Sequence, residues 1–271
     1  MRFNLGESVF VVLLLLLGTI VRAEESNGEK SPLRINLNVG GMTVQGNLTQ
    51  YQVNGGGLIS YDGKVYGSDT VINGYRMWAQ FPGSDELTKI GDDLNIAEIP
   101  YYYVRPKVYV QGFANYSTSQ LHQIDDRYLG GASIGYTPVR EKMKLFRASL
   151  GAFWEQTTFP SETFNQDVEH ENGVRSIPRI GVISNGWYRV PNNKRLSLNY
   201  LAWFYVNPLN LDDYRYRINT QFNVNLTPVV QLRLATTYQH NSVVMEGVSE
   251  FDLRSNVGLG FSFPPKEKPK S

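Results

Sequence analysis

The chain has 271 residues, of which 41% are hydrophobic and 13% aromatic, and its 26 basic and 25 acidic residues leave a formal net charge of +1. A charge balance this close to neutral does not support a nucleic-acid-binding surface, so we expect no nucleic-acid partner. Cysteine is absent, which excludes disulfides, thiolate metal sites and cysteine nucleophiles. The length fits a single barrel domain.

The first residues have the pattern of an export signal. Arg2 precedes a short apolar run from Val9 to Ile20, and small residues lead up to Ala23. The run is shorter than the roughly 20 apolar residues that a membrane helix needs. We therefore predict a secretory signal peptide over residues 1–23, cleaved after Ala23, followed by a polar, disordered lead-in over residues 24–32.

The rest of the chain is a series of segments with two different faces. In the last segment the apolar parity consists of Phe251, Leu253, Val257, Leu259, Phe261 and Phe263. The other parity consists of Glu250, Asp252, Arg254, Asn256, Gly258, Gly260 and Ser262. Successive side chains of a strand point to opposite faces, so this segment is predicted to be a strand with one apolar and one polar face.

Similar segments recur about twelve times, an even number as in single-chain outer-membrane barrels. We expect strands at Leu33–Val39, Gln50–Tyr61, Val65–Trp78, Leu94–Val104, Val108–Tyr116, Tyr128–Tyr136, Leu145–Thr157, Arg175–Tyr188, Arg195–Tyr205, Tyr214–Leu226, Val230–Gln239 and Glu250–Phe263. This pattern predicts an all-β fold, a transmembrane antiparallel up-and-down β-barrel of about 12 strands over residues 33–263. Residues 264–271 are predicted to be a disordered tail.

The connections alternate in length, which favours the same fold. Short links are expected at Asp62–Gly63, Arg105–Pro106, Thr137–Lys144, Pro191–Lys194 and Thr227–Pro228. Longer links are expected at Ala79–Asp93, Ser119–Asp126, Thr158–Val174, Asn207–Asp213 and Asn241–Ser249. Only the first link, at Gly46–Asn47, breaks the alternation. Outer-membrane barrels have short periplasmic turns and longer external loops, so we expect the long links to face outward.

Alternation alone does not decide which face is inside. A soluble barrel or sandwich would bury the apolar parity and expose the polar one. Aromatic residues near the strand ends favour the membrane, where they form interfacial girdles. The residues assigned to these girdles are Tyr61, Tyr66, Trp78, Tyr101, Tyr102, Tyr103, Tyr116, Tyr136, Trp154, Tyr188, Tyr214 and Phe263. Leu253, Val257, Leu259, Phe261 and Phe263 are accordingly predicted to face lipid.

The polar parity predicts a basic lumen. The residues expected to line it are Arg34, Arg147, Arg179, Arg215, Arg217, Arg233 and Arg254, with Glu155 and Asp252 and with Asp69, Glu98 and Asp213 as further acids. Arginine keeps its proton, so these charges are permanent. Two interpretations stay open: arginine and carboxylate pairs that plug the barrel, or a narrow channel whose basic side chains favour anions. A barrel of about twelve strands lies between filled small barrels and open porins.

Candidate catalytic and metal sites are few. His122, His170 and His240 fall in predicted links or at a strand end, and His240-Asn241-Ser242 has the residue types of a phospholipase-like site. Three adjacent residues do not by themselves present nucleophile, base and orienting group at hydrogen-bonding distance, so we expect solvated residues and no catalysis. The pairs Asp92-Asp93, Asp125-Asp126 and Asp212-Asp213 could bind calcium, but solvated carboxylates are the expected state. No metal and no cofactor is predicted.

Several short stretches resemble a known family. They are the Gly46-Asn47 turn, Asp126-Arg127-Tyr128, the glycine-rich strand from Gly130 to Tyr136, and Leu145 to Gly151. These stretches are similar to the salt-induced outer-membrane protein family, which carries domain of unknown function 481. The resemblance implies a Gram-negative outer-membrane barrel and transfers no functional residue. Pro264 to Ser271 departs from the pattern, because such barrels usually end at the aromatic that corresponds to Phe263.

The resulting hypothesis is a passive outer-membrane channel for small solutes or ions. Its expected surroundings are outer-membrane lipid and lipopolysaccharide, reached with the help of the barrel-assembly machinery after export. The alternatives are a lipid-modifying enzyme of phospholipase type, and a structural or surface-binding barrel without transport.

Overall fold

The computed structural model describes residues 33–44, 49–63, 65–84, 86–141, 143–191, 193 and 195–263. The predicted signal peptide, the lead-in, the Gly46–Asn47 turn and the tail lie outside the described residues. Within the described ranges, no helix has the length and apolar character needed to cross a membrane.

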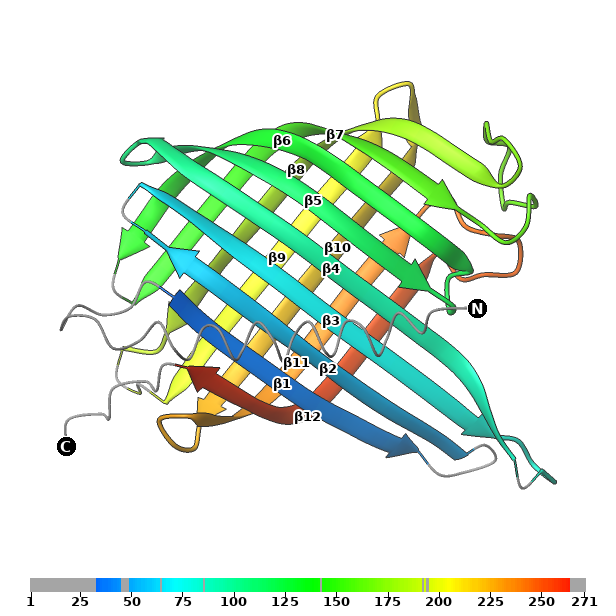
Figure 1. The fold of residues 1–271 in the computed structure, drawn as a ribbon, viewed down its shortest axis with the longest axis horizontal. Coiled ribbons are helices and arrows are strands. Elements are labelled where there is room, and N and C mark those ends of the chain that lie inside the picture. The colour runs from blue at the N-terminus through cyan, green and yellow to red at the C-terminus, as the bar shows by residue number, and fades with distance from the viewer. Residues whose placement is uncertain are drawn as a thin grey trace, which may run out of the picture. The chain divides into compact units, whose positions relative to one another are not determined.

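The described chain forms a closed antiparallel barrel of twelve strands (Figure 1). This confirms the predicted fold class. The strands are β1 Leu33–Val44, β2 Thr49–Asp62, β3 Tyr66–Gln80, β4 Leu87–Arg105, β5 Val108–Ser119, β6 Ile124–Glu141, β7 Lys144–Thr158, β8 Val174–Arg189, β9 Leu196–Asn207, β10 Asn210–Asn225, β11 Val230–Asn241 and β12 Phe251–Phe263.

Each strand pairs with its neighbours in sequence, and β1 closes the barrel against β12. The closing pair is the shortest ladder, because it joins only Ile35–Gly40 of β1 to Gly258–Phe263 of β12. By comparison, β12 pairs with β11 from Phe251 to Phe261. The seam between the first and last strands is therefore paired along only part of its length.

Several strands are longer than the sequence suggested, which corrects three of the expected long links. In these three links, the only residues outside strands are residues 81–86 between β3 and β4, residues 120–123 between β5 and β6, and residues 208–209 between β9 and β10. Backbone pairing continues there past the end of the apolar alternation, because polar side chains are tolerated on both faces of a strand that reaches water. The links at 159–173 and 242–250 are long, as predicted.

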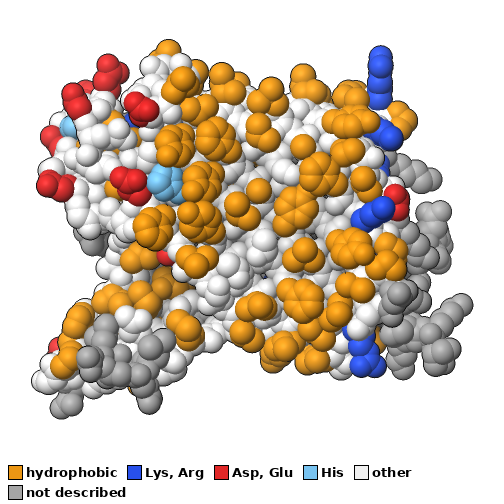
Figure 2. Space-filling model, turned by 180° about the vertical axis from the view of Figure 1, so that it is seen from behind, with side chains coloured by type: hydrophobic (Ala, Val, Ile, Leu, Met, Phe, Trp, Pro, Cys, Tyr) orange, Lys and Arg blue, Asp and Glu red, His pale blue; other side chains and the backbone are white. Residues whose placement is uncertain are grey.

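The barrel is apolar outside and polar inside. Ile134, Leu150 and Leu253 are 67%, 60% and 64% exposed, whereas Arg179 and Glu155 are 3% and 2% exposed. Figure 2 shows apolar side chains over the wall of the barrel, with Asp and Glu gathered at one end and Lys and Arg at the other. A soluble barrel would have the opposite arrangement, so the exterior is matched to hydrocarbon and the strands span a membrane.

Candidate functional site

The lumen contains a buried cluster of arginines and carboxylates, which we call the arginine–carboxylate cluster. Its members are Arg127 of β6, Glu155 of β7, Arg175 and Arg179 of β8, and Asp213 and Arg215 of β10. All six are buried. Four guanidinium groups surround two carboxylates, so the cluster carries more positive than negative charge.

Glu155 is the centre of this cluster. Arg215 Nη2 donates to Glu155 Oε2 at 2.6 Å, and Arg179 Nη2 and Arg127 Nε lie 3.4 and 3.8 Å from Oε1. Asp213 accepts from Arg175 Nη2 at 2.7 Å and from Arg179 Nη1 at 2.8 Å. Charge-assisted bonds of this kind are stronger than neutral ones, so the cluster ties four strands together through the lumen.

A second group of side chains, which we call the mouth network, lies near the turn between β5 and β6. Asp93 of β4 accepts from Ser119 Oγ of β5 at 2.8 Å and from Arg254 Nη1 of β12 at 2.8 Å. Arg254 also donates through Nε to Asp252. The Arg254 guanidinium lies 4.9 Å from the ring centroid of Tyr75 on β3. The strands β4 and β12 are separated in the sheet by β1, β2 and β3, so this network crosses the lumen.

His122 extends the mouth network from the turn. Its backbone nitrogen donates to Ser119 Oγ at 3.1 Å, and its Nε2 accepts from the Gln239 side-chain amide of β11 at 2.6 Å. The same Nε2 lies 3.8 Å from Asp252 Oδ2. His122 is therefore buried against the lumen wall rather than solvated, which corrects the expectation for this residue.

Aromatic and aliphatic side chains fill another part of the lumen. Leu129, Phe153, Ile183 and Tyr205 form one buried group on β6 to β9, and Tyr101, Tyr103 and Tyr109 form another on β4 and β5. Arg147 lies over the Tyr101 ring at 4.3 Å and donates to the Tyr101 hydroxyl at 3.3 Å. The side chains of this wall are buried and packed on one another, so they fill this part of the lumen.

The wall formed by β12 and β1 to β4 is built differently. Many of its lumen-facing positions are glycines and amides that are half-buried or exposed, which leaves them within reach of water. They include Asn256 and Gly258 of β12, Asn36 and Asn38 of β1, Asn54 and Gly56 of β2, Asn73 of β3 and Asn95 of β4. Between this wall and β10 lies Arg233 of β11, whose Nε donates to Asn223 Oδ1 at 3.3 Å.

The two long links pack on each other at one end of the barrel. Phe164 and Met245 form a β-bridge between them, and Asn165 Nδ2 donates to the Ser242 carbonyl at 3.0 Å. Phe159, Met245 and Ile124 form a small buried core beneath them. This end of the barrel is thus partly covered by ordered loops.

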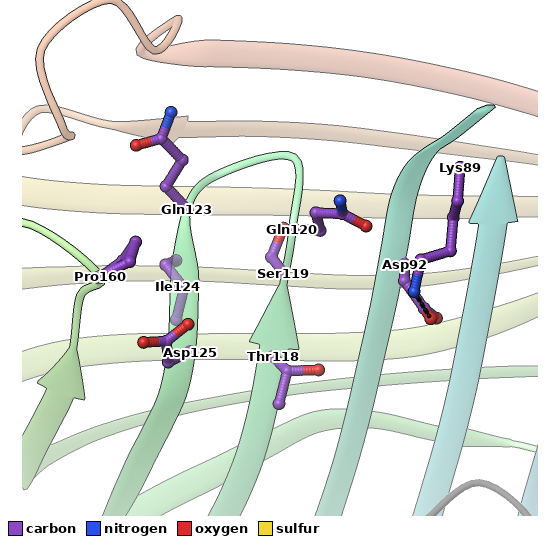
Figure 3. Close-up of a pocket in the computed structure, with 9 residues that line it drawn as sticks. All are labelled: Lys89, Asp92, Thr118, Ser119, Gln120, Gln123, Ile124, Asp125 and Pro160. Atoms are coloured by element: carbon purple, nitrogen blue, oxygen red, sulfur yellow. Dashed lines mark hydrogen bonds and ion pairs between the residues drawn. The ribbon is translucent and has the colours of Figure 1, made fainter. Parts of the chain in front are cut away.

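A cavity of about 390 Å³ lies at the same end, on the rim (Figure 3). It is lined by Lys89, Asp92, Thr118, Ser119, Gln120, Gln123, Ile124, Asp125 and Pro160. Asp92 is engaged by Lys89 Nζ at 2.9 Å and by Arg76 Nη2 at 3.2 Å. The cavity is open to solvent, and its lining does not include any residue of the arginine–carboxylate cluster.

The structure places the predicted lumen residues as follows. Arg147, Arg179, Arg215, Arg233 and Glu155 are buried, Arg217, Arg254 and Asp252 are half-buried, and Arg34 at the start of β1 is exposed. By the strand register all of them share the face that carries the buried side chains. The residues predicted to meet lipid lie on the opposite parity, where Leu253, Val257, Leu259 and Phe263 are exposed and Phe261 is half-buried.

Three expected positions on β4 are wrong. Glu98 lies on the outward parity, where Ser68 and Thr70 of β3 donate to its carboxylate. Tyr101 and Tyr103 are buried in the lumen and do not belong to an interfacial girdle. Both faces of this strand carry large or apolar residues around Pro100, so hydrophobicity did not identify the inner face.

Two contributors to the arginine–carboxylate cluster were missed from the sequence. Arg127 and Arg175 stand at the ends of their strands, where a charge is usually solvated. The available signal was parity, because Arg127 shares the inner parity of Leu129 and Arg175 that of Arg179.

The His240-Asn241-Ser242 stretch does not assemble a catalytic triad. The His240 ring stacks on Tyr214 and Tyr216 at centroid distances of 5.4 and 5.3 Å. Ser242 Oγ accepts from the Tyr214 backbone nitrogen at 2.9 Å. The buried His240 Nε2 has no hydrogen-bond partner among the described residues. The serine is therefore not oriented by the histidine.

Three of the six paired aspartates are engaged with basic side chains, which corrects the expectation of solvated carboxylates for these three. Asp92, Asp93 and Asp213 all form ion pairs. Across the described ranges, no group of three or more His, Cys, Asp and Glu residues is arranged to hold a metal ion.

A family model described as "Protein of unknown function, DUF481" matches residues 37–263. The chain belongs to this family. The match begins within β1, covers the other eleven strands and confirms the resemblance seen in the sequence. Among curated proteins, none matches the chain.

Several solved structures are similar in shape. The COG4313 outer membrane channel from Pseudomonas putida F1 is 13% identical, with a TM-score of 0.45 and coverage of 88% of this chain and 97% of that one. The NanC porin is 10% identical, with a TM-score of 0.43 and coverage of 85% and 97%. The translocator domain of the autotransporter NalP from Neisseria meningitidis is 11% identical, with a TM-score of 0.42 and coverage of 95% and 97%. Similarities this remote say nothing about what this chain binds.

Proposed function

We propose that this chain is an outer-membrane barrel that conducts small solutes or ions and prefers anions. The observation that carries the proposal is the charge of the lumen. The buried charged side chains of the described barrel are six arginines, Arg127, Arg147, Arg175, Arg179, Arg215 and Arg233, but only two carboxylates, Glu155 and Asp213. A pore lined by basic side chains lowers the electrostatic barrier for anions.

The route of passage is proposed to follow the glycine and amide wall of β12 and β1 to β4. The opposite wall is filled by aromatic side chains and by the arginine–carboxylate cluster, whereas the amide wall is half-buried and polar. Arg233 borders this route. Its Nη2 lies only 3.2 Å from the position that a Cβ on Gly260 would occupy, so the guanidinium covers the glycine wall of β12. Such a conduit is narrow and suits small solutes.

The test is single-channel recording of the folded, purified chain in a planar bilayer under a salt gradient. We expect discrete conductance steps and a reversal potential that reports anion preference. Arg233→Gln should reduce the anion preference, whereas Arg76→Gln, which removes an exposed arginine outside the lumen, should leave it unchanged. Absence of conductance from folded protein would overturn the proposal and favour a structural or surface-binding barrel.

A further inference from the structure

The seam between β1 and β12 leaves a free strand edge. The β1–β12 ladder ends at the pair Gly40–Gly258, although β12 continues to Phe251 and β1 continues to Val44. Residues 251–257 of β12 pair with β11 on one side. Within the described part of the chain, no strand pairs with their other side. β1 and β12 separate beyond the last pair, as Figure 1 shows.

The point of separation is marked by two glycines. A Cβ on Gly258 would lie 2.4 Å from the Val39 carbonyl oxygen, so the two backbones are in close contact there. Gly41, the next residue of β1, pairs with Val53 of β2 but with no residue of β12. The ladder between the two strands therefore ends at the close contact of Gly40 with Gly258.

The outward side of this free edge is apolar. Its outward residues Phe251, Leu253 and Val257 are 61%, 64% and 54% exposed. Seven residues of strand are about 20 Å long, a large part of the hydrocarbon thickness. Backbone N–H and C=O groups that face hydrocarbon must be satisfied by other polar groups, and lipid tails offer none.

The edge also lacks the usual protection on its membrane side. Exposed edges are commonly blunted by Lys, Pro, a bulge or inward-pointing charges. The inward-pointing charges of this stretch, Asp252 and Arg254, are engaged in the mouth network. The outward residues of this stretch are Phe251, Leu253, Ser255 and Val257, and the pairing with β11 runs without a register shift. The edge therefore has the properties of a strand that is built to be paired.

We propose that the free edge of β12, residues 251–257, binds an extended segment of another polypeptide by strand addition. The segment would run antiparallel to β12 and alternate apolar residues toward lipid with polar residues toward the lumen, where Arg254 and Asn256 lie. Main-chain hydrogen bonds supply the affinity in this mode, and the alternating side chains supply the selectivity.

Other occupants fit less well. Two copies of the chain inserted in the same direction would present their β12 strands parallel to each other, and β1 of a second copy has only Gly41–Val44 free. Residues 264–271 contain three prolines and three lysines, and residues 24–32 are almost entirely polar, so neither segment of this chain has the required alternation.

The absence of cysteine permits a direct test of the edge. The probe is a synthetic peptide of seven residues, the length of the free edge 251–257, that alternates valine and threonine and carries cysteine at its third position. Paired antiparallel with residues 251–257, it sets this cysteine opposite Ser255. The mature chain carrying Ser255→Cys is folded in detergent micelles and mixed with the probe under mild oxidation. The control is Ala152→Cys, at an exposed position of β7 that is paired on both sides.

We expect the disulfide-linked fraction to be severalfold higher for Ser255→Cys than for Ala152→Cys, and to fall to the control level when the probe carries prolines at its fourth and fifth positions. In micelles, hydrogen exchange should slow on addition of the probe at those amides of residues 251–257 that do not pair with β11. Equal linkage at both positions would overturn the proposal. So would a spontaneous disulfide in the double variant Thr43→Cys/Ser255→Cys, since β1 would then cover the edge.

Discussion

Arg254 on β12 and Asp93 on β4 form an ion pair of 2.8 Å between strands that are separated by β1, β2 and β3. The pair is held in place by Asp252, by Ser119 and by the ring of Tyr75. An ion pair between side chains of opposite walls occupies the space between those walls, so it narrows the lumen at this end. The mouth network is therefore the principal candidate for the constriction of the proposed conduit.

Removing this ion pair is expected to widen the conduit. The double variant Arg254→Ala/Asp93→Ala deletes one positive and one negative charge, so the net charge of the lumen does not change. We predict a larger single-channel conductance with an unchanged ion preference. The matched control is Arg76→Ala/Asp92→Ala, which removes an exposed ion pair of 3.2 Å outside the lumen and should leave the conductance as it was. Equal conductance of the two double variants would contradict this role.

Loss of the central carboxylate of the arginine–carboxylate cluster is expected to destabilise the barrel. Glu155→Gln leaves Arg127, Arg179 and Arg215 buried with less compensating charge, and breaking a buried ion pair typically costs about 3–5 kcal/mol. Denaturant unfolding in micelles, followed by tryptophan fluorescence, measures the change. Glu162→Gln, in the long link between β7 and β8, is exposed and should change the free energy of unfolding little. A stability of the Glu155 variant equal to that of the control would show that the cluster contributes nothing.

Alanine is expected to destabilise the barrel at Gly181 but not at Gly74. A Cβ on Gly181 would lie 2.1 Å from Tyr205 Cδ1 and 2.7 Å from the Phe204 carbonyl oxygen, whereas a Cβ on Gly74 would meet nothing within 4 Å. Overpacking of a filled interior costs about 1–3 kcal/mol. Gly181→Ala should therefore lower the free energy of unfolding by this amount, and Gly74→Ala should not. Thermal unfolding of both variants in the same detergent makes the comparison, and tolerance of Gly181→Ala would mean that the aromatic wall is loosely packed.

The outward face of β12 gives a prediction about charge in the membrane. Leu259 is exposed on the apolar face, so Leu259→Arg should cost about 2–4 kcal/mol if the residue lies at the midplane and less toward an interface. Asn256→Arg, on the lumen face of the same strand, should cost less because the new charge enters a polar interior. Folded fractions by heat-modifiable gel mobility in vesicles distinguish the two. A larger cost for Asn256→Arg than for Leu259→Arg would mean that Asn256, and not Leu259, faces lipid.

Much of the fold follows from the sequence because one rule, two-residue alternation, marks most of the strands. On β12 every residue predicted to face lipid is exposed except Phe261, which is half-buried. The rule failed on β4, where Tyr101 and Tyr103 are as apolar as the outward residues and where hydroxyl groups of β3 make an outward position acceptable for Glu98.

Sequence reasoning reached the lumen residues but not their grouping. Parity shows that Arg179 and Glu155 face inward. It does not show that Arg215 on β10 also reaches Glu155 on β7. Such contacts depend on the tilt of the strands and on the length of the side chains. The partial pairing of β1 with β12 could not be predicted from the sequence either, because no local pattern distinguishes a paired strand edge from a free one.

The central claim is that the polar face of every strand lies inside a barrel whose outside is matched to lipid. The most direct test is to refold the mature chain with and without micelles and to compare gel mobility before and after heating. Folding that requires micelles, with a mobility shift on heating, is the predicted result. A chain that reaches a compact folded state in plain buffer would contradict the account, because the same strands would then have to bury their apolar faces.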